Sequence, residues 1–490
     1  MPLSDPVAAL RAVTTPAVPA LDPATHRRLR EVTDQLIAAR ADIATEELER
    51  FEQTAARGLR VDHERLLDLH AGRTVVVTGG TGCIGAEVTR QVATYRPARV
   101  VVLSRGRFAG SRPLPGVEYR RLDLRDAAAV RATLADLRPD VVYHLAAQHD
   151  PGLAERLVAE TLATNVAGTA HLVEACGELA DAGELRLACA STGKALRPFT
   201  PDVYAGSKKV TEWLLRHAAA PGRATAALSL SAVRFTHVVD NSIIHRRLAD
   251  WCAADEPIRL HDPGSMFYLQ SAREAAELLL TSALDSRPGD LSLSAIRDLG
   301  WPVSLLDLAI GMLVRTGSRA VLQCCGYEAG YEKRPYPALY DPLVSGERSP
   351  LFSSLEAFGV QEAPSSVEVD LLRTPAAACS TAGLAVADVM ARARAEDVDD
   401  TLRRVLVETG WGLLQDWLTT LGDAEIDRHL VLLRAHAPDL VEVDDLRIRE
   451  CVEFEASRRR GDASRTSGTT RPSDARTATE PRVPALVPAP

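Results

Sequence analysis

The chain has 490 residues, of which 46% are hydrophobic and 25% charged, enough for roughly one to three domains with a sizeable core. Its 57 basic and 66 acidic residues give a net charge of −9, which argues against a nucleic-acid-binding protein. No apolar run reaches the roughly 18 residues of a membrane-spanning helix, and no signal peptide is visible. The cysteines and histidines lack metal-ligand spacing, so we expect a reduced, cytoplasmic protein without a metal site.

Residues 1–23 are rich in Pro and Ala and predict a flexible tail. Residues 24–71 place apolar side chains at helical spacing, which predicts an N-terminal helical segment. From residue 72 to about 240, short apolar runs alternate with helical patterns. This alternation predicts an α/β fold with a doubly wound parallel sheet, a Rossmann dinucleotide-binding domain. The predicted strands are 74–78, 100–103, 141–144, 185–190 and 226–233, and the helices between them are 86–95, 127–137, 155–182 and 207–218.

The mixed pattern of residues 241–345 predicts a smaller substrate-binding α/β region that is partly interleaved with the Rossmann core. Residues 346–457 predict a C-terminal helical region, and residues 458–490 predict a basic, disordered tail. The two added helical segments could pack on the core, mediate oligomers or bind a partner. We expect a homo-oligomer.

A glycine-rich loop, Gly79-x-x-Gly82-x-x-Gly85, follows the first strand and opens the first helix. Missing side chains let the backbone turn tightly and approach a pyrophosphate at the helix N-terminus. The alternative is a glycine-rich turn without a ligand. The residues expected to bind a dinucleotide here are Gly79, Thr81, Gly82, Cys83, Ile84 and Gly85.

The end of the second strand carries Ser104 and Arg105 where an NAD-preferring site usually has an Asp or Glu. These two residues suit a 2′-phosphate, so NADP is favoured and NAD remains possible. Asp123, followed by Leu124, lies one strand further on, where a carboxylate could meet the adenine amino group. A plain turn acid is the alternative.

Tyr204-Ala-Gly-Ser-Lys208 has the YxxxK spacing, which places the two side chains one helical turn apart. An ammonium beside a phenol lowers the phenol pKa from about 10 towards neutrality. The pair could therefore exchange a proton with a sugar hydroxyl while a hydride moves to nicotinamide. Only four lysines occur in the chain, at positions 194, 208, 209 and 333, so a lysine within a motif is a candidate functional residue. We expect Lys209 to be a solvent-facing neighbour of Lys208.

The order of glycine loop, Ser191-Thr192 strand end and YxxxK motif resembles the extended short-chain dehydrogenase/reductases. Within them, Ser191-Thr-Gly-Lys-Ala195 resembles the STDKA segment of the CapD-type polysaccharide-biosynthesis group, which comprises nucleotide-sugar dehydratases and epimerases. Further matches, in order, are His144-Leu-Ala-Ala147 to HAAA, Thr164-Asn-Val-Ala-Gly-Thr169 to TNVxGT, Arg234-Phe-Thr-His-Val238 to RFGNV, residues 300–309 to GxPVxILDLA and residues 326–333 to GLRPGEK.

The resemblance implies three sets of site residues. The catalytic set is Tyr204, Lys208, Ser191 or Thr192, and Lys194. Cofactor contacts are added at Ala146, Ala147 and Asn165, besides Tyr204 and Lys208. Substrate contacts are implied at Arg234, Tyr268 and Lys333.

Several positions depart from the family pattern. Gly193 stands where the dehydratases carry the Asp that serves as an acid for the leaving 6-hydroxyl. Phe267 replaces an expected Arg, and the Arg of GLRPGEK is missing, which weakens the inferred grip on a nucleotide diphosphate.

We therefore expect an NADP-dependent nucleotide-sugar enzyme of the 4,6-dehydratase/epimerase type that first oxidises C4 of a UDP- or dTDP-hexose. Its pathway would be polysaccharide or glycosylated-metabolite biosynthesis. The alternatives are a nucleotide-sugar 4-epimerase or ketoreductase and, from another class, a non-catalytic NADP-binding interaction protein.

Overall fold

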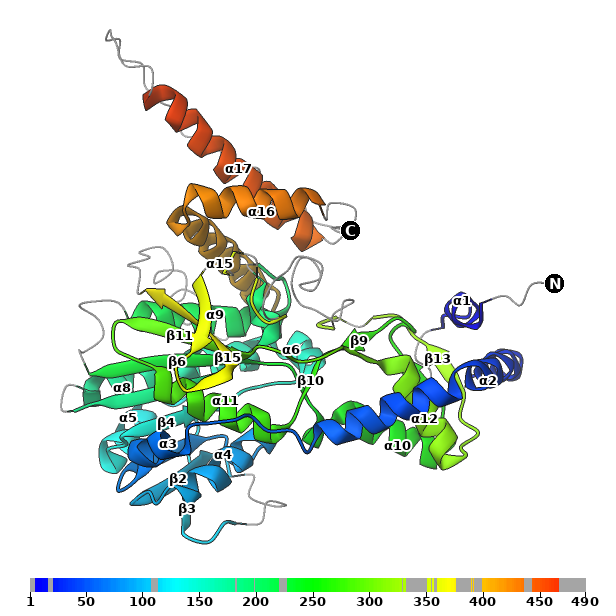
Figure 1. Cartoon of the computed structure of the whole chain (residues 1–490), viewed down its shortest axis with the longest axis horizontal. Coiled ribbons are helices and arrows are strands. Elements are labelled where there is room, and N and C mark those ends of the chain that lie inside the picture. Colours follow the sequence, from blue (N-terminus) through cyan, green and yellow to red (C-terminus); the bar gives the residue numbers. More distant parts are fainter. Residues whose placement is uncertain are drawn as a thin grey trace.

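The computed structural model contains a large sheet covered by helices, with a smaller α/β unit beside it and a helical unit packed on one side (Figure 1). The structure describes residues 5–15, 21–106, 113–180, 183–197, 199–219, 227–327, 329–331, 350–353, 355–356, 359–375, 389, 391, 399–435 and 443–466.

Within the described residues, nine strands form one sheet in the order β14-β15-β11-β6-β5-β4-β1-β2-β3. All neighbours from β3 to β11 run parallel, and β15 and β14 add an antiparallel edge. This order confirms the predicted doubly wound Rossmann architecture. The strands that follow β1 are added on one side as far as β3, and from β4 onward they are added on the other side of β1. The strands are β1 (Thr74–Thr78), β2 (Arg99–Ser104), β3 (Val117–Arg121), β4 (Val141–His144), β5 (Leu185–Thr192), β6 (Leu228–Phe235), β11 (Asp290–Ile296), β14 (Val360–Ala363) and β15 (Ser366–Pro375).

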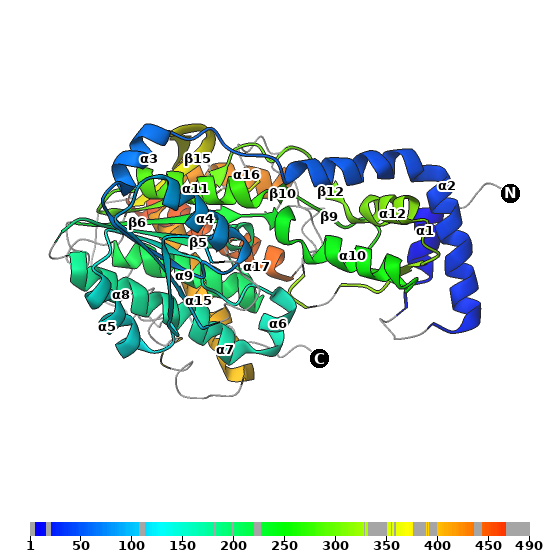
Figure 2. The same ribbon diagram turned by 90° about the horizontal axis from the view of Figure 1, so that it is seen from below.

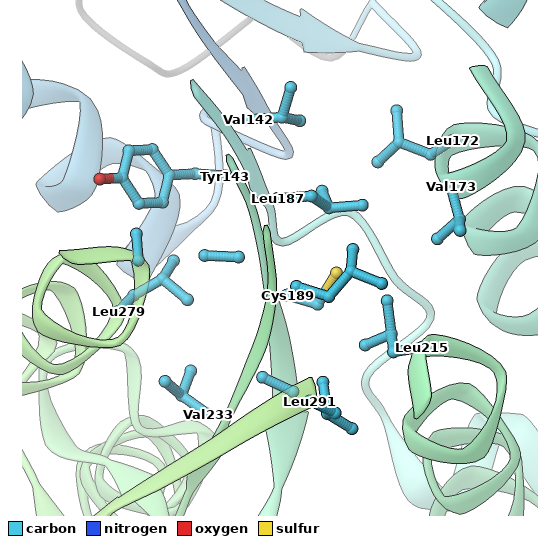
Figure 3. Packing of buried hydrophobic residues seen from close by; sticks show 14 of the residues in the cluster. Val142, Tyr143, Leu172, Val173, Leu187, Cys189, Leu215, Val233, Leu279 and Leu291 are labelled. Atoms are coloured by element: carbon cyan, nitrogen blue, oxygen red, sulfur yellow. The ribbon is translucent and has the colours of Figure 1, made fainter. Parts of the chain in front are cut away.

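Helices cover both faces of this sheet, so its central strands are buried on both sides and consist largely of apolar residues. In Figure 3, Leu279 of α11 packs on one face, whereas Leu172 of α8 and Leu215 of α9 pack on the other. The helices of this layered core are α3 (His63–His70), α4 (Cys83–Thr94), α5 (Ala127–Leu137), α8 (Gly168–Ala180), α9 (Val203–Ala218) and α11 (Ala272–Asp285).

The helix predicted over residues 155–182 is broken into several pieces. They are α6 (Pro151–Arg156), α7 (Val158–Leu162), a π-helical turn (Ala163–Ala167) and α8. Such π-helical turns often occur at functional sites, and this one contains Asn165.

The smaller unit has its own hydrophobic core and lies beside the carboxyl ends of the sheet strands (Figure 2). The N-terminal helix α2 (Pro23–Thr54) belongs to this core and packs along α12. The other elements of the unit are β7 (His237–Val238), α10 (Ile243–Ala253), β8 (Ile258–Leu260), β9 (Met266–Phe267), β10 (Leu269–Gln270), β12 (Val303–Ser304), α12 (Leu305–Thr316) and β13 (Leu322–Cys324).

Three predictions about the ends of the chain need correction. The tail predicted for residues 1–23 contains a helix, α1 (Pro6–Ala12), because Asp5 caps it and Leu10 is fully buried. Residues 360–375 form the β14–β15 hairpin instead of helix, since polar and apolar residues alternate from Ser366 to Leu371. Residues 458–466, predicted to belong to a disordered tail, are helical as the end of α17 (Val443–Thr466), and the rest of that predicted tail lies outside the described residues.

The C-terminal helical unit consists of α15 (Asp399–Thr420), α16 (Asp423–Ala435) and α17 (Val443–Thr466). These helices share a third core, and α15 packs against α9 of the Rossmann domain. Among the described helices, none combines the length and the apolar character that crossing a membrane would require.

Candidate active site

The predicted dinucleotide loop is a tight turn between β1 and α4. Gly79 has a φ of +72°, and a Cβ there would lie 2.7 Å from the backbone nitrogen of Ala146. A Cβ on Gly85 would lie 2.3 Å from the carbonyl oxygen of Gly79. Both positions therefore require glycine, and Gly82 caps α4, whose free N–H groups suit a pyrophosphate. Thr81, Cys83 and Ile84 are half-buried in the same turn, and burial raises the pKa of the Cys83 thiol to about 11.

The neighbouring strand end is held next to this loop by buried hydrogen bonds. The His144 ring contacts the hydroxyls of Thr78 at 2.7 Å and Thr169 at 2.9 Å. Burial, with a smaller contribution from Lys208, lowers the pKa of His144 to about 3, so the ring is neutral. The Ala146 N–H donates to the Thr78 hydroxyl at 3.3 Å, which places Ala146 and Ala147 beside the glycine turn.

The end of β2 carries the residues expected to select the cofactor. Arg105 is exposed and pairs with Glu160 at 3.3 Å. Asp123 accepts bonds from the guanidinium and the N–H of Arg125, and these bonds lower its pKa. Leu124 is buried, with its carbonyl facing His171 at 2.8 Å. At this strand end Arg105 and Arg125 therefore each pair with an acidic side chain, Glu160 and Asp123 respectively.

Tyr204 and Lys208 lie one turn apart at the start of α9, as the YxxxK spacing predicts. The Lys208 ammonium donates to the Ala190 carbonyl at 2.9 Å, and burial lowers its pKa to about 8. Tyr204 is half-buried, and its carbonyl accepts a 2.7 Å bond from the Ser207 hydroxyl. Asn165 donates to that hydroxyl at 3.0 Å, so in this structure it fixes α9 against the π-helical turn.

The strand end β5 separates the two candidate hydroxyls. Ser191 donates to the buried carboxylate of Glu212 at 2.6 Å. Thr192 ends the strand and caps the short 3-10 helix Gly193–Leu196, with its hydroxyl accepting the backbone N–H of Lys194 at 3.4 Å. Successive side chains alternate along a strand, so only one of the two faces Glu212. Ser191 is therefore engaged by Glu212, whereas the Thr192 hydroxyl lies against the backbone of the following turn.

Arg234 forms a buried ion-pair network instead of the predicted substrate contact. It is fully buried and bonds to Glu212 and Glu356 at 2.8 to 3.0 Å, and to the Leu351 carbonyl at 3.0 Å. Burial would lower its pKa, but the two carboxylates raise it. All five N–H groups of a guanidinium are used in these contacts, so none is left for a substrate. The sequence resemblance did not reveal this, because Glu356 lies far along the chain.

The position that a carboxylate would occupy next to Thr192 is taken by an apolar side chain. A Cβ on Gly193 would lie 2.5 Å from the Leu351 side chain, which is 1% exposed. Leu351 belongs to a segment that also supplies Glu356 to Arg234. The expected Asp is thus replaced by Gly193, and the side chain of Leu351 occupies the space next to it.

Lys194 contacts the loop of residues 326–333, which resembles the GLRPGEK motif but lacks its Arg. Its ammonium donates to the Gly330 carbonyl at 2.9 Å, and it is half-buried beside Thr192. Tyr331 of the same loop packs on His261, with ring centroids 4.7 Å apart. Lys333, predicted to contact substrate, lies outside the described residues.

Two aromatic residues of the predicted substrate region point into packed interior. Tyr268 is 3% exposed and belongs to the main core, and its carbonyl accepts a bond from the Thr236 hydroxyl at 2.9 Å. Phe267, which replaces an expected Arg, packs on His237 at a centroid distance of 4.8 Å. A substrate contact at Tyr268 has no support in this arrangement.

Comparison with known proteins gives matches across this region. A model of the family described as polysaccharide biosynthesis protein matches residues 75–333. Capsular polysaccharide biosynthesis protein CapD of Staphylococcus aureus is 26% identical over 287 residues, which are 56% of this chain and 45% of that protein. UDP-N-acetylglucosamine 4,6-dehydratase (inverting) of Campylobacter jejuni is 28% identical over 148 residues, which are 29% of this chain and 42% of that protein. The chain therefore spans less than half the length of either relative.

The fold also has a counterpart among solved structures. The X-ray structure of Pen from Bacillus thuringiensis superposes with a TM-score of 0.51 at 19% identity. The superposition covers 63% of this chain and 88% of that chain. At this identity the likeness concerns the fold alone.

Proposed function

Because the chain belongs to the polysaccharide biosynthesis protein family, as a CapD-type extended short-chain dehydrogenase/reductase, we propose that it is an NADP-dependent enzyme acting on a nucleotide-linked hexose. The observation that carries this proposal is the Tyr204–Lys208 pair on α9: Lys208 donates to Ala190 near the end of β5, in the same parallel set of strand ends as the glycine turn that follows β1. The sugar class comes from the family and from the names of the two relatives.

The residues of the glycine turn fit a dinucleotide. Gly79 and Gly85 leave open the space that a Cβ would fill, which is the condition for close approach of a pyrophosphate. Ser104 and Arg105 would hold a 2′-phosphate, which is why NADP is proposed over NAD. When bound, the nicotinamide supplies hydride transfer to and from C4 of the hexose.

The chain's own residues move the proton. Tyr204 takes the proton of the C4 hydroxyl, and Thr192 donates a hydrogen bond to the same oxygen. The Lys208 ammonium, held by the Ala190 carbonyl, favours the phenolate of Tyr204 through its positive charge. Its pKa near 8 keeps most of the population charged at neutral pH.

The surroundings of Gly193 favour chemistry without elimination of water. Elimination needs an acid at the leaving oxygen, but Leu351 fills the place beside Gly193. Glu212 and Glu356 are both paired with Arg234. A nucleotide-sugar 4-epimerase or ketoreductase is therefore favoured over a 4,6-dehydratase.

Cofactor titration and one substitution test this proposal. Purified protein is expected to bind NADPH more tightly than NADH and to convert a UDP- or dTDP-hexose. Tyr204→Phe is expected to keep NADPH binding within about twofold and to lower turnover at least about a hundredfold. If the protein binds NADPH and the Tyr204→Phe variant still replaces the wild type in cells, the alternative of a non-catalytic interaction protein would be supported instead. Absence of cofactor binding would reject both.

A further inference from the structure

Helix α15 lies outside the family-matched residues 75–333, yet it packs directly on the catalytic helix α9 (Figure 1). A Cβ on Gly206 would lie 3.1 Å from the side chain of Leu406 of α15. Gly206 is part of the YxxxK segment, between Tyr204 and Lys208. Further along, Trp417 of α15 meets Trp213 edge-on, with centroids 5.5 Å apart. The added helix therefore touches the catalytic segment itself.

A second contact joins α15 to the first turn of α9 through Glu155 of α6. One carboxylate oxygen of Glu155 accepts the N–H of Val203 at 2.8 Å. Val203 is the first residue of α9, and Asp202, the capping residue, makes no side-chain capping bond. Glu155 thus satisfies one of the N–H groups that a helix start leaves without a partner. Its negative charge also suits the positive end of the helix dipole.

Arg403 of α15 holds Glu155 in this position. Its guanidinium pairs with the second carboxylate oxygen of Glu155 and donates to the Glu155 carbonyl at 2.9 Å. The Glu155 side chain is 10% exposed and that of Arg403 34% exposed, so the carboxylate of the pair is largely buried and the guanidinium partly open to solvent. Asp399, at the start of α15, accepts the N–H of Ala159 at 3.2 Å and ties the helix to α7.

Glu155 also borders the loop that contacts Lys194. A Cβ on Gly330 would lie 3.2 Å from the Glu155 side chain, and the Gly330 carbonyl accepts the Lys194 ammonium at 2.9 Å. Glu155 therefore stands between the helix start that carries Tyr204 and the loop that holds Lys194. A shift of this one side chain reaches both groups.

We propose that Arg403 and Glu155 are positioning residues, through which the C-terminal helical unit fixes the first turn of α9 and so the phenol of Tyr204. The link acts through a backbone N–H adjacent to Tyr204, so it sets where the phenol lies relative to Lys208 and Thr192. This inference rests on the proposed function, because only there is Tyr204 catalytic.

The decisive variant is Arg403→Ala, which frees Glu155 without touching the site. It is expected to lower kcat at least about tenfold with KM within about twofold, because small misplacements of reacting groups cost rate. Arg403→Lys, which keeps a charge near Glu155, is expected to recover part of that loss. Leu418→Ala serves as control, since Leu418 is 1% exposed in the core of the C-terminal helical unit and lies about four helical turns from Arg403 along α15. That control is expected to lower stability but keep kcat within about twofold.

Hydrogen exchange gives a readout that needs no substrate. Amides of residues 199–208 are expected to exchange faster in Arg403→Ala than in the wild type. They should remain protected in Arg404→Ala, which changes an exposed neighbour on α15. If the wild type converts no nucleotide sugar, the proposed function fails, and the exchange comparison still tests the link. Unchanged exchange in Arg403→Ala, or a kcat loss equal to that of Leu418→Ala, would overturn the inference.

Discussion

Gly193 and Leu351 lie against each other at the point where the candidate site departs most from its family. Their packing is tight enough that a single methyl group on Gly193 would need Leu351 to move, since the ideal Cβ lies 2.5 Å from it. The identity of one residue therefore depends on another that follows it by more than a hundred positions. Local chemistry at Thr192 and Lys194 is set by this packing as much as by the motif.

A double-mutant cycle tests this dependence. Gly193→Ala is expected to cost about 1 to 3 kcal/mol through overpacking. In the Leu351→Ala background, which makes room, the same substitution is expected to cost less than about 0.5 kcal/mol. Urea unfolding of the four proteins measures the coupling. Additive losses would show that Gly193 and Leu351 do not compete for space.

Arg234 illustrates how a motif residue acquires a structural role. Burial alone would raise the pKa of Glu356, but the charge of Arg234 lowers it to about 2. Arg234→Met is expected to destabilise the fold by about 3 to 5 kcal/mol at neutral pH, because two buried carboxylates lose their partner. The loss should shrink as the pH falls, since those carboxylates then become neutral. A loss below about 1 kcal/mol in urea unfolding at pH 7 would contradict the network.

At the scale of elements, the glycine turn depends on backbone contacts that no side chain can share. Gly85→Ala places a Cβ against the Gly79 carbonyl, so the turn must open. NADPH binding is expected to weaken at least about tenfold while the fold survives. Gly177→Ala in α8 is the matched control, because a Cβ there meets nothing within 4 Å. Equal NADPH affinities of the two variants in a fluorescence titration would show that the glycine turn does not bind the cofactor.

The elements that the sequence predicted best are those with continuous apolar runs. The strands from β1 to β6 were located to within a few residues, except β3, whose charged residues Glu118, Arg120 and Arg121 hide it at the edge of the parallel strands. The hairpin β14–β15 is not predicted, because its regular alternation covers only Ser366–Leu371 and helical patterns follow it. The long helix over 155–182 was predicted as continuous, but α6, α7 and the π-helical turn divide it.

Lys209 was expected to face solvent and is in fact buried. It is 6% exposed and lines a cavity of about 10 Å³ with Trp213, Glu356 and Trp417. Burial lowers the pKa of Lys209, and the negative charges of Glu356 and Glu212 oppose this effect. The error arose because α9 is covered on its outer side by α15, which the motif pattern does not reveal.

On the scale of the whole molecule, the candidate site is assembled from distant parts of the chain. The glycine turn, the YxxxK helix and the strand ends follow from sequence, because each motif lies within one βα unit. Glu155, Leu351, Glu356 and Arg403 could not be predicted, since only the folded chain brings them to α9 and β5. Each of these residues stands alone in the sequence, outside any motif with a characteristic spacing, so nothing in the sequence marks it.

Stability of the whole molecule is expected to fall on acidification. Burial lowers the pKa of His70 to about 4 and those of His144 and His429 to about 3, from 6.5. Between about pH 6.5 and pH 4 the three histidines bind protons in the unfolded chain but not in the folded chain. The free energy of unfolding that is present above pH 6.5 is therefore lost as the pH falls. Three histidines give a slope of up to about 4 kcal/mol per pH unit.

Denaturant midpoints between pH 7 and pH 5 measure this slope. His429→Gln, which removes one of the three buried rings, is expected to reduce it by about a third. Replacing the exposed His149 in the same way is expected to leave the slope unchanged. A stability that stays flat between pH 7 and pH 5 would contradict the burial of neutral histidines.

The mass of the reaction product tests the central claim, that Tyr204 and Lys208 act on a nucleotide-linked hexose without elimination. The protein is incubated with NADP⁺ and UDP- or dTDP-hexoses, or with NADPH and their 4-keto derivatives, and the sugars are separated by chromatography and analysed by mass spectrometry. We expect epimerisation without mass change, or reduction of a keto-sugar by NADPH, in the wild type and neither in Tyr204→Phe. A product lighter by one water would contradict the role assigned to Gly193 and Leu351, and conversion undiminished in Tyr204→Phe would contradict the catalytic assignment.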